Sequence, residues 1–480
     1  MSRLTLPSRT LISLLAAASF APLAHAQTAT SDKQRVEELE QRLLILERKL
    51  EIQTEEAATK AKEAPVVTAS DKGFSLKNAK GDYEIKFTAL GQIDGRYFVD
   101  DDGAFRDGFV TRRLRPTLQG TLGKLVAFRF TPEFAGNGLG DVAGANSIVD
   151  AYFDLRFDPR ASLRVGKQKG PVGLERLQSG GAIQLVERGF PTELVPNRDI
   201  GVALYGEFAQ GTIQYSAGAF NGTADGREDS TADDGLKEFE GRVFLEPFKN
   251  DYGFLKGLGF GLAGSSGAKD GAGNNYISRY RSPGQNQFFT YDGGSAATGT
   301  AAATPAVIAT GKHTRYAPQA YFYINNIGLL AEYTVSEQDL SRGGVERTVK
   351  NDAYNLTASY VLTGEDASFK GVKPARPYAV GAEGWGALEL VARIGALDVD
   401  NAVFTGTTTG ATANRFANPT TQASKAENYA VGINWYLTQN AKLTADYNFT
   451  QFEGGGGGTA AAPVDRRDEK AVFTRLTIQY

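Results

Sequence analysis

The chain has 480 residues, a formal net charge of −3, no cysteine, and only two histidines, His25 and His313. These counts exclude disulfides and thiolate metal sites and argue against a multi-histidine metal centre, while the mild charge and slightly negative mean hydropathy exclude a helical membrane protein and a strong nucleic-acid binder. The 56 glycines, 20 tyrosines and 28 phenylalanines are instead typical of an outer-membrane β-barrel.

The N-terminus has the pattern of a Sec signal peptide over residues 1–26. Arg3 and Arg9 form a basic region, and residues 11–20 form an apolar stretch too short to span a bilayer as a helix. Ala24-His25-Ala26 is a small-x-small cleavage site. The alternative is an uncleaved N-terminal anchor. On the first interpretation the protein leaves the cytoplasm.

Residues 31–63 contain no glycine or proline and predict a periplasmic coiled-coil helix. Apolar residues recur at alternating spacings of 3 and 4 along a seam, namely Val36, Leu39, Leu43, Leu46 and Leu50. Such a helix is marginal alone, so we expect three copies to bury the seam in a trimer. The alternative is a solvated, partly frayed spacer. Residues 64–82 are expected to be a linker.

From residue 83 the apolar period changes to two, which predicts β-strands. At the C-terminus, Leu476 and Ile478 share one face, while Arg475, Thr477 and Gln479 share the other. Strands of about ten residues, with aromatic residues near their ends, suit a lipid-facing band around a polar lumen. Sixteen such segments predict an all-β fold over residues 83–480, a 16-stranded antiparallel transmembrane β-barrel. The segments are 83–99, 107–122, 125–134, 148–158, 161–171, 200–209, 212–220, 238–247, 254–264, 313–325, 327–335, 352–362, 384–398, 427–437, 441–452 and 472–480.

The connections differ in length and composition. The tight turns at 122–124, 158–160, 210–211 and 438–440 indicate periplasmic connections. The stretches 265–312, 336–351, 399–426 and 453–470 indicate extracellular loops.

The connection 172–199 differs because apolar residues such as Leu174, Leu185 and Phe190 are distributed among its charges. Such a segment can fold inward, pack on the barrel wall and act as a constriction loop. The alternative is a surface cap on the barrel rim.

Several motifs resemble the phosphate-selective porin O and P family over about residues 75–480. They are Arg112-Arg113-Leu114-Arg115, Val149-Asp150-Ala151-Tyr152, the run from Arg164 to Leu177, Leu362-Thr363-Gly364-Glu365, and Trp385-Gly386-Ala387-Leu388-Glu389. The resemblance implies a trimeric barrel of the Gram-negative outer membrane in which basic residues guide anions to a narrow eyelet. It matches Arg112 and Arg113 to paired arginines of the second strand, and Lys167 and Lys169 to basic positions before the inward loop.

The alternation of faces supports part of this site. If Leu114 faces lipid, Arg113 and Arg115 face the lumen, as do Arg129 and Arg164 on later strands. We expect the inward loop to add Arg176 and Arg188. Lys167 and Lys169 share parity with Val165, so they reach the lumen only if the strand ends or bulges there. Ordinary solvation in a wet lumen is the alternative for each of these residues.

The same alternation places twelve basic and nine acidic side chains in the lumen. This small positive excess leaves phosphate selectivity open, because a balanced ladder of charges gives only weak selectivity.

The sequence therefore favours a passive diffusion porin that prefers anions such as phosphate or polyphosphate. Alternatives are a general, weakly selective porin and a structural tether in which the N-terminal helix contacts the cell wall. A hydrolase is disfavoured because no serine motif accompanies His313.

We predict no catalytic residue, metal or cofactor. The partners expected are other copies in a homotrimer, outer-membrane lipids and small anions, without nucleic acid. The acidic runs 100–102 and 233–234 could bind calcium or be solvated turns.

Overall fold

The computed structural model describes residues 32–99, 105–135, 147–228, 235, 237–251, 253–273, 276–300, 302–381 and 383–480. The chain divides into two units, Met1–Ala64 and Pro65–Tyr480. The predicted signal peptide and the acidic runs 100–102 and 233–234 lie outside the described residues. Within the described ranges, no helix has the length and apolar character to cross a membrane.

The first unit contains the helix α1 (Asp32–Glu63), which confirms the predicted helical segment. Its seam is exposed along its length, from Val36 at 52% to Leu50 at 67%. The seam is therefore available to another chain, and the coiled coil stays a prediction.

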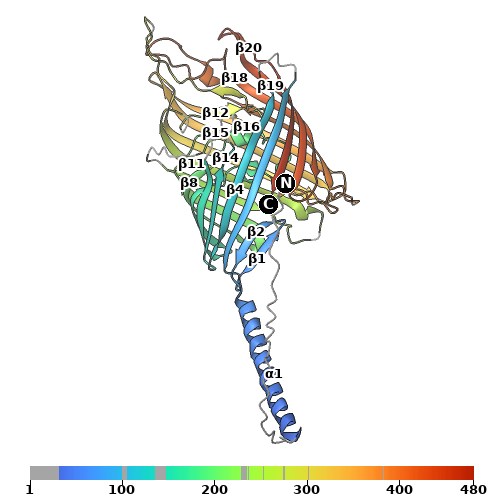
Figure 1. Cartoon of the computed structure of the whole chain (residues 1–480). Coiled ribbons are helices and arrows are strands. Elements are labelled where there is room, and N and C mark those ends of the chain that lie inside the picture. Colours follow the sequence, from blue (N-terminus) through green and yellow to red (C-terminus); the bar gives the residue numbers. More distant parts are fainter. Residues whose placement is uncertain are drawn as a thin grey trace, which may run out of the picture. The chain divides into compact units, whose positions relative to one another are not determined.

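The second unit is a closed barrel in which the described residues form sixteen strands, all paired antiparallel, with β21 closing onto β3 (Figure 1). Each of the sixteen predicted segments overlaps one of these strands. They are β3 (Tyr83–Phe98), β4 (Gly108–Leu122), β5 (Val126–Glu133), β6 (Ser147–Asp158), β7 (Ala161–Gln168), β8 (Asp199–Phe208), β9 (Ile213–Phe220), β10 (Glu238–Leu245), β11 (Leu258–Gly271), β14 (Ile308–Ile324), β15 (Ile327–Arg342), β16 (Val345–Val361), β17 (Ala387–Asp398), β18 (Ala423–Tyr436), β19 (Ala441–Gly458) and β21 (Glu469–Gln479).

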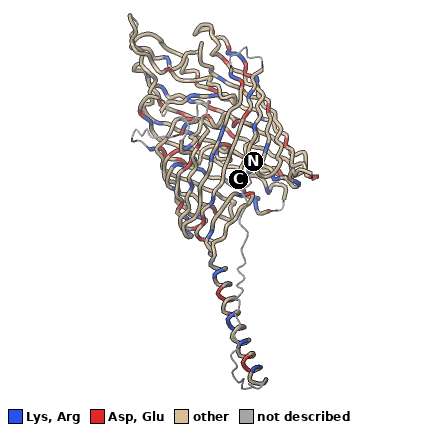
Figure 2. The backbone as a smooth tube through the Cα atoms, in the orientation of Figure 1, with Lys and Arg blue, Asp and Glu red and all other residues tan. Residues whose placement is uncertain are grey.

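The apolar faces of the strands point outward and the polar faces point into the barrel. On β21, Leu476 and Ile478 are exposed, whereas Arg475 and Thr477 are 2% and 1% exposed. A soluble protein would bury the opposite face, so this inversion is the pattern of a barrel with a lipid-facing exterior. Acidic and basic residues are interspersed along the strands (Figure 2).

The barrel has two unlike ends. The end at which β3 begins, called here the turn end, carries short connections at 123–125, 159–160, 325–326 and 437–440. It also carries one long connection, residues 362–386, between β16 and β17. The opposite end, called here the loop end, carries the long connections 272–307 and 399–422.

The predicted loop at 336–351 is wrong. Strands β15 and β16 continue through this range and meet at Gly343 and Gly344, whose φ angles are +58° and +78°. Glycine adopts such positive φ angles without strain, which is what a two-residue hairpin turn requires.

The expected linker 64–82 contains more structure than a linker. Strands β1 (Val66–Ser70) and β2 (Gly73–Lys77) form an antiparallel hairpin, and β2 pairs with the start of β3. This hairpin therefore extends the sheet beside the first barrel strand.

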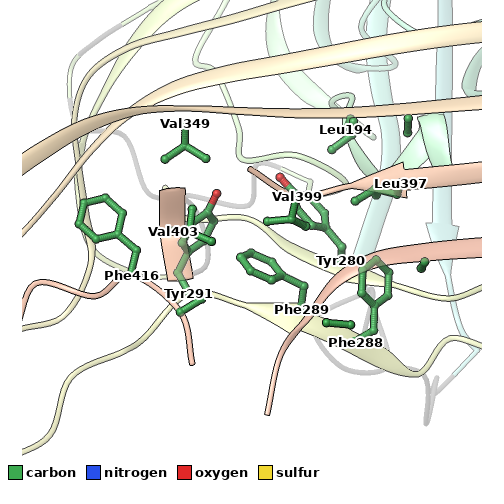
Figure 3. Close-up of a cluster of buried hydrophobic side chains, with 14 of the residues drawn as sticks. Leu194, Tyr280, Phe288, Phe289, Tyr291, Val349, Leu397, Val399, Val403 and Phe416 are labelled. Atoms are coloured by element: carbon green, nitrogen blue, oxygen red, sulfur yellow. The ribbon is translucent and has the colours of Figure 1, made fainter. Parts of the chain in front are cut away.

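The range 265–312 is only partly a loop, because β11 extends to Gly271 and β14 begins at Ile308. Between them, β12 (Arg279–Arg281) and β13 (Gln287–Thr290) form a buried hairpin. Its aromatic residues Tyr280, Phe288 and Phe289 pack with Phe190 in the largest apolar cluster of the described residues (Figure 3). Part of this connection therefore packs as an apolar core instead of forming a solvated loop.

Short elements complete the described structure. They are α2 (Leu174–Leu177), β20 (Pro463–Asp465), which pairs with β19, and the 3-10 helices η1 (Phe190–Glu193), η2 (Ala209–Gly211), η3 (Phe254–Gly257) and η4 (Asn401–Phe404).

Candidate functional site

Residues 172–199, called here the inward loop, cross the barrel interior. The backbone N–H groups of Leu174 and Glu175 donate to the carboxylate of Glu332 on β15 at 2.7 and 3.1 Å. The N–H of Val186 donates to Asp446 on β19 at 2.6 Å. These contacts lie on the wall opposite β7 and β8, so the segment is not a cap on the rim.

Apolar side chains of the inward loop pack on the inner wall. Leu174 packs with Phe244 and Leu330, and Leu185 packs with Val391 and Ala430. These anchors are the ones that distinguished the segment in the sequence. Because the start and the middle of the loop are hydrogen-bonded to the wall, the loop has a fixed position in the interior.

A bulge in β4 brings two consecutive arginines to the same side. Gln92 of β3 pairs with Arg113, but the next residue, Ile93, pairs with Thr111, so Arg112 is the extra residue. Both guanidiniums are buried, with Arg112 at 7% and Arg113 at 4% exposure. Simple alternation would turn Arg112 outward, and the bulge is the physical reason that it lies inside.

Glu187 of the inward loop binds three arginines from three strands. Arg112 of β4 donates to it at 2.7 and 3.2 Å, Arg96 of β3 at 2.6 Å, and Arg475 of β21 at 3.4 Å. Burial opposes ionisation of Glu187, but these guanidiniums outweigh it and hold its pKa well below the usual range. The charge of Arg112 is therefore compensated within the protein.

Two cavities adjoin at the inward loop. The larger, about 430 Å³, extends toward the turn end, where Tyr480 lines it. The smaller, about 60 Å³, extends toward the loop-end residue Gln285. Both are lined by Arg115, Lys169, Gly180 and Arg198. The two cavities therefore meet at these four residues, three of which are basic. We call the interior around the smaller cavity the narrow part, because the cavity volume there is only about 60 Å³.

The lining is strongly positive. The smaller cavity has three acidic side chains (Glu187, Glu193 and Glu228) and seven basic ones (Arg112, Arg113, Arg115, Lys169, Arg176, Arg188 and Arg198). The larger has one acidic side chain, Asp150, and five basic ones (Arg115, Arg129, Arg164, Lys169 and Arg198). The near balance expected for the whole lumen therefore does not hold at its narrow part.

Four of these cations have only neutral hydrogen-bond partners among the described residues. Arg113 donates to Gln92 at 2.5 Å, and its Nε is buried without a partner. Arg188 donates to the carbonyls of Glu175 and Gln178, and Lys169 donates to three carbonyls of residues 176–178. Arg176 donates to Asn197 and to the carbonyl of Thr192. Their positive charge is left for a mobile anion.

The other predicted residues have acidic partners. Arg115 donates to Glu133 at 2.5 Å, and Arg129 lies 3.5 Å from Asp150. Arg164 makes two hydrogen bonds to Asp154, at 2.7 and 3.0 Å, and lies over the rings of Tyr152 and Tyr205. Lys167 lies 3.5 Å from Glu228 and lines neither cavity. Lys169 reaches the interior because β7 ends at Gln168.

Glu193 lowers the net positive charge in a pH-dependent way. Burial raises its pKa to about 7, although Arg176 acts in the opposite direction. Below that pH the carboxyl is neutral, so the smaller cavity then carries two acidic charges rather than three.

Sequence reasoning missed Arg198 and Glu187. Arg198 donates to Asp150 at 3.0 Å and belongs to both cavity walls. It lies at the end of the inward loop, where strand parity makes no prediction, although the polar run Asn197-Arg198-Asp199 marks the place. Glu187 bonds to residues 75, 91 and 288 positions away, and no local pattern indicates such pairings.

Comparison with known proteins gives a family and distant structural likenesses. The model of the family described as phosphate-selective porin O and P matches residues 88–477. The chain is similar to the outer membrane channel DcaP of Acinetobacter baumannii, with 12% identity, a TM-score of 0.49, and coverage of 85% of this chain and 100% of the other. It is also similar to OmpT of Vibrio cholerae, with 10% identity, a TM-score of 0.48, and coverage of 87% of this chain and 100% of the other. A third similar structure is an anion-selective porin from Comamonas acidovorans, with 14% identity, a TM-score of 0.46, and coverage of 82% of this chain and 99% of the other. With TM-scores below 0.5, these likenesses transfer no function to this chain. No curated protein sequence matches it.

Proposed function

Because the chain belongs to the phosphate-selective porin O and P family and is thus an outer-membrane porin, we propose that its narrow basic interior selects anions. The observation that carries the proposal is the ratio of seven basic to three acidic side chains around the smaller cavity. In a narrow, partly dehydrated passage, such charges act more strongly on ions than they do in bulk water.

Phosphate is the anion for which the arginines are best suited. A guanidinium offers a planar fork of donors that matches two phosphate oxygens. Arg113, Arg176 and Arg188 have no acidic hydrogen-bond partner among the described residues, so they can turn donors toward a passing anion without breaking an ion pair.

The test is planar-bilayer conductance of the purified protein in chloride with increasing phosphate. We expect phosphate to reduce the chloride current more strongly than sulfate does at the same concentration. If phosphate and sulfate act alike while chloride remains preferred over potassium, the protein is a general anion porin. A preference for potassium would contradict anion selection altogether.

For the whole assembly, we propose a homotrimer joined along the wall from β5 to β10. Strands β5, β7, β9 and β10 have 8 residues each, whereas β14, β15, β16 and β19 have 16 to 18. An eight-residue strand tilted by about 45° rises roughly 19 Å, less than an apolar band of about 25 Å. Contact with a second copy would shield this wall from lipid.

We place the short turns and α1 on the periplasmic side, as is general for bacterial barrels, and propose that the α1 seams of three copies associate. Leu43→Cys should form disulfide-linked dimers on mild oxidation of the purified protein, because the chain has no other cysteine. Gln41→Cys, which lies on the opposite face of the same helix turn, is the matched control. Equal cross-linking of the two variants would contradict a specific coiled coil and would favour the frayed spacer.

A further inference from the structure

A second cavity system at the turn end has a chemistry unlike that of the basic narrow part. A cavity of about 530 Å³ lies between β10, β14, the inward loop and the connection 362–386. It is lined by Phe244, Tyr321, Tyr323 and Phe369, with Leu174 and Leu177 of the inward loop beside them. We call it the aromatic pocket.

The strand residues of this pocket occupy lumen-facing positions. Phe244 shares the inward face of β10 with Arg242, and Tyr321 and Tyr323 share the inward face of β14 with Gln319. A porin lumen is generally polar, so three inward aromatic rings on β10 and β14, the two strands that flank β11, need a local reason. Packing supplies part of it, since Phe369 stacks on Tyr321 at 5.4 Å and Phe244 lies 5.1 Å from Tyr321. The remaining cavity shows that this packing does not fill the space.

The charges around the aromatic pocket favour an anion. Arg242 lies over the ring of Phe244 at 4.3 Å and donates only to Gln319, at 3.0 Å, among the described residues. The one carboxylate in the lining, Glu246, already accepts from Lys249 at 2.9 Å and from Tyr321 at 2.9 Å. Lys370 adds an exposed ammonium at the edge. The uncompensated charge is therefore positive, beside an apolar floor.

We propose that the aromatic pocket binds small organic anions that carry an aromatic ring, with the acid group at Arg242 and the ring against the aromatic side chains. Inorganic phosphate has no apolar part that could contact the aromatic and leucine side chains of the pocket. An aromatic ring would be buried against these side chains and would stack on their rings. The proposal extends the porin's solutes beyond inorganic anions, and it rests on the chain being an open channel.

The pocket also has a path to the basic narrow part. A further cavity of about 460 Å³ shares Gln214, Arg242 and Leu177 with the aromatic pocket. It shares Arg164, Lys169 and Leu177 with the larger basic cavity. An anion that passes the narrow part therefore meets basic side chains on its way to the aromatic pocket.

The test compares benzoate with acetate, which carries the same charge without a ring, as blockers of chloride current in the bilayer-inserted full-length protein. Benzoate should block at a concentration on the order of tenfold lower than acetate. Phe369→Leu keeps an apolar side chain but removes the ring. It should raise the blocking concentration of benzoate by a similar factor and leave the blocking concentration of acetate unchanged. Arg242→Gln should weaken the block by both anions.

Tyr378→Ala is the control, because Tyr378 lies on the same connection but is exposed and does not line the pocket. Equal block by benzoate and acetate in the wild type would overturn the aromatic pocket while leaving anion selection at the narrow part intact. Equal effects of Phe369→Leu and Tyr378→Ala on benzoate block would overturn it as well. A benzoate block that exceeds the acetate block in a channel without chloride preference would support the pocket and contradict the proposed function.

Discussion

Replacing Arg113 with glutamine is expected to lower the ratio of chloride to potassium permeability by up to about tenfold. Arg113 lines the smaller cavity, is 4% exposed, and has only the neutral Gln92 as a partner among the described residues. One unit charge acting on an ion at about 10 Å, with an effective dielectric constant of about 20, is worth roughly 1–2 kcal/mol. Glutamine keeps a polar side chain that can still contact Gln92.

The matched control for this prediction is Lys124→Gln. Lys124 lies in a turn at the end of the barrel and is exposed, so salt screens its charge beyond about 8–10 Å. For both variants, the reversal potential in a potassium chloride gradient gives the ratio of chloride to potassium permeability. If Lys124→Gln changes the permeability ratio as much as Arg113→Gln does, the narrow part does not set selectivity.

Replacing Glu187 with glutamine is expected to have the larger structural effect. The change removes the carboxylate that binds Arg112, Arg96 and Arg475 together. Breaking a buried ion pair by removing one partner costs about 3–5 kcal/mol, because the remaining charges stay buried. We expect the variant to unfold in detergent at a lower temperature, and the loosened inward loop to raise single-channel conductance and current noise.

Glu193→Gln is the matched control in the same loop. Because the pKa of Glu193 is about 7, its carboxyl is partly protonated at neutral pH, and the neutral amide changes little. If Glu187→Gln has the unfolding temperature and the conductance of the wild type, the three arginines do not depend on the carboxylate of the inward loop. Glu187 would then not be the group that compensates the charge of Arg112.

The barrel could be predicted from sequence because lipid on one side and water on the other impose a strict alternation on each strand. The outward apolar pattern does not extend into residues 336–351, which continue β15 and β16 into a hairpin at Gly343 and Gly344. There the outward positions are polar, while Leu340 and Val349 on the inward face are buried. The expected loop there reflects the loss of the lipid-facing pattern rather than a break in the strands.

The inward loop could be predicted because its apolar residues need a wall to pack on, but its contacts could not. Arg112 lies inside because of one bulge between Gln92 and Ile93, which parity cannot anticipate. The opposite case is found at residues 279–281. The sequence predicts an extracellular loop there, yet Tyr280 is fully buried and Arg281 is 6% exposed. The aromatic residues of 272–307 have to be buried, and the open loop end of the barrel offers them an interior.

The distribution of charge shows the limit of counting residues. Twelve basic and nine acidic side chains by parity indicate a nearly neutral lumen. The inward loop adds Arg176, Arg188 and Arg198 to one part of it, and the acidic residues Glu332, Glu389 and Asp446 bind the loop's own polar groups on the opposite wall. The surplus of positive charge at the narrow part arises from this folding and not from composition.

Anion selection is tested most directly by the reversal potential of the wild-type protein in a planar bilayer that separates two concentrations of potassium chloride. We expect the sign that corresponds to chloride as the more permeant ion, because uncompensated basic side chains line the narrow part of the interior. A potential of the opposite sign, with potassium as the more permeant ion, would contradict it.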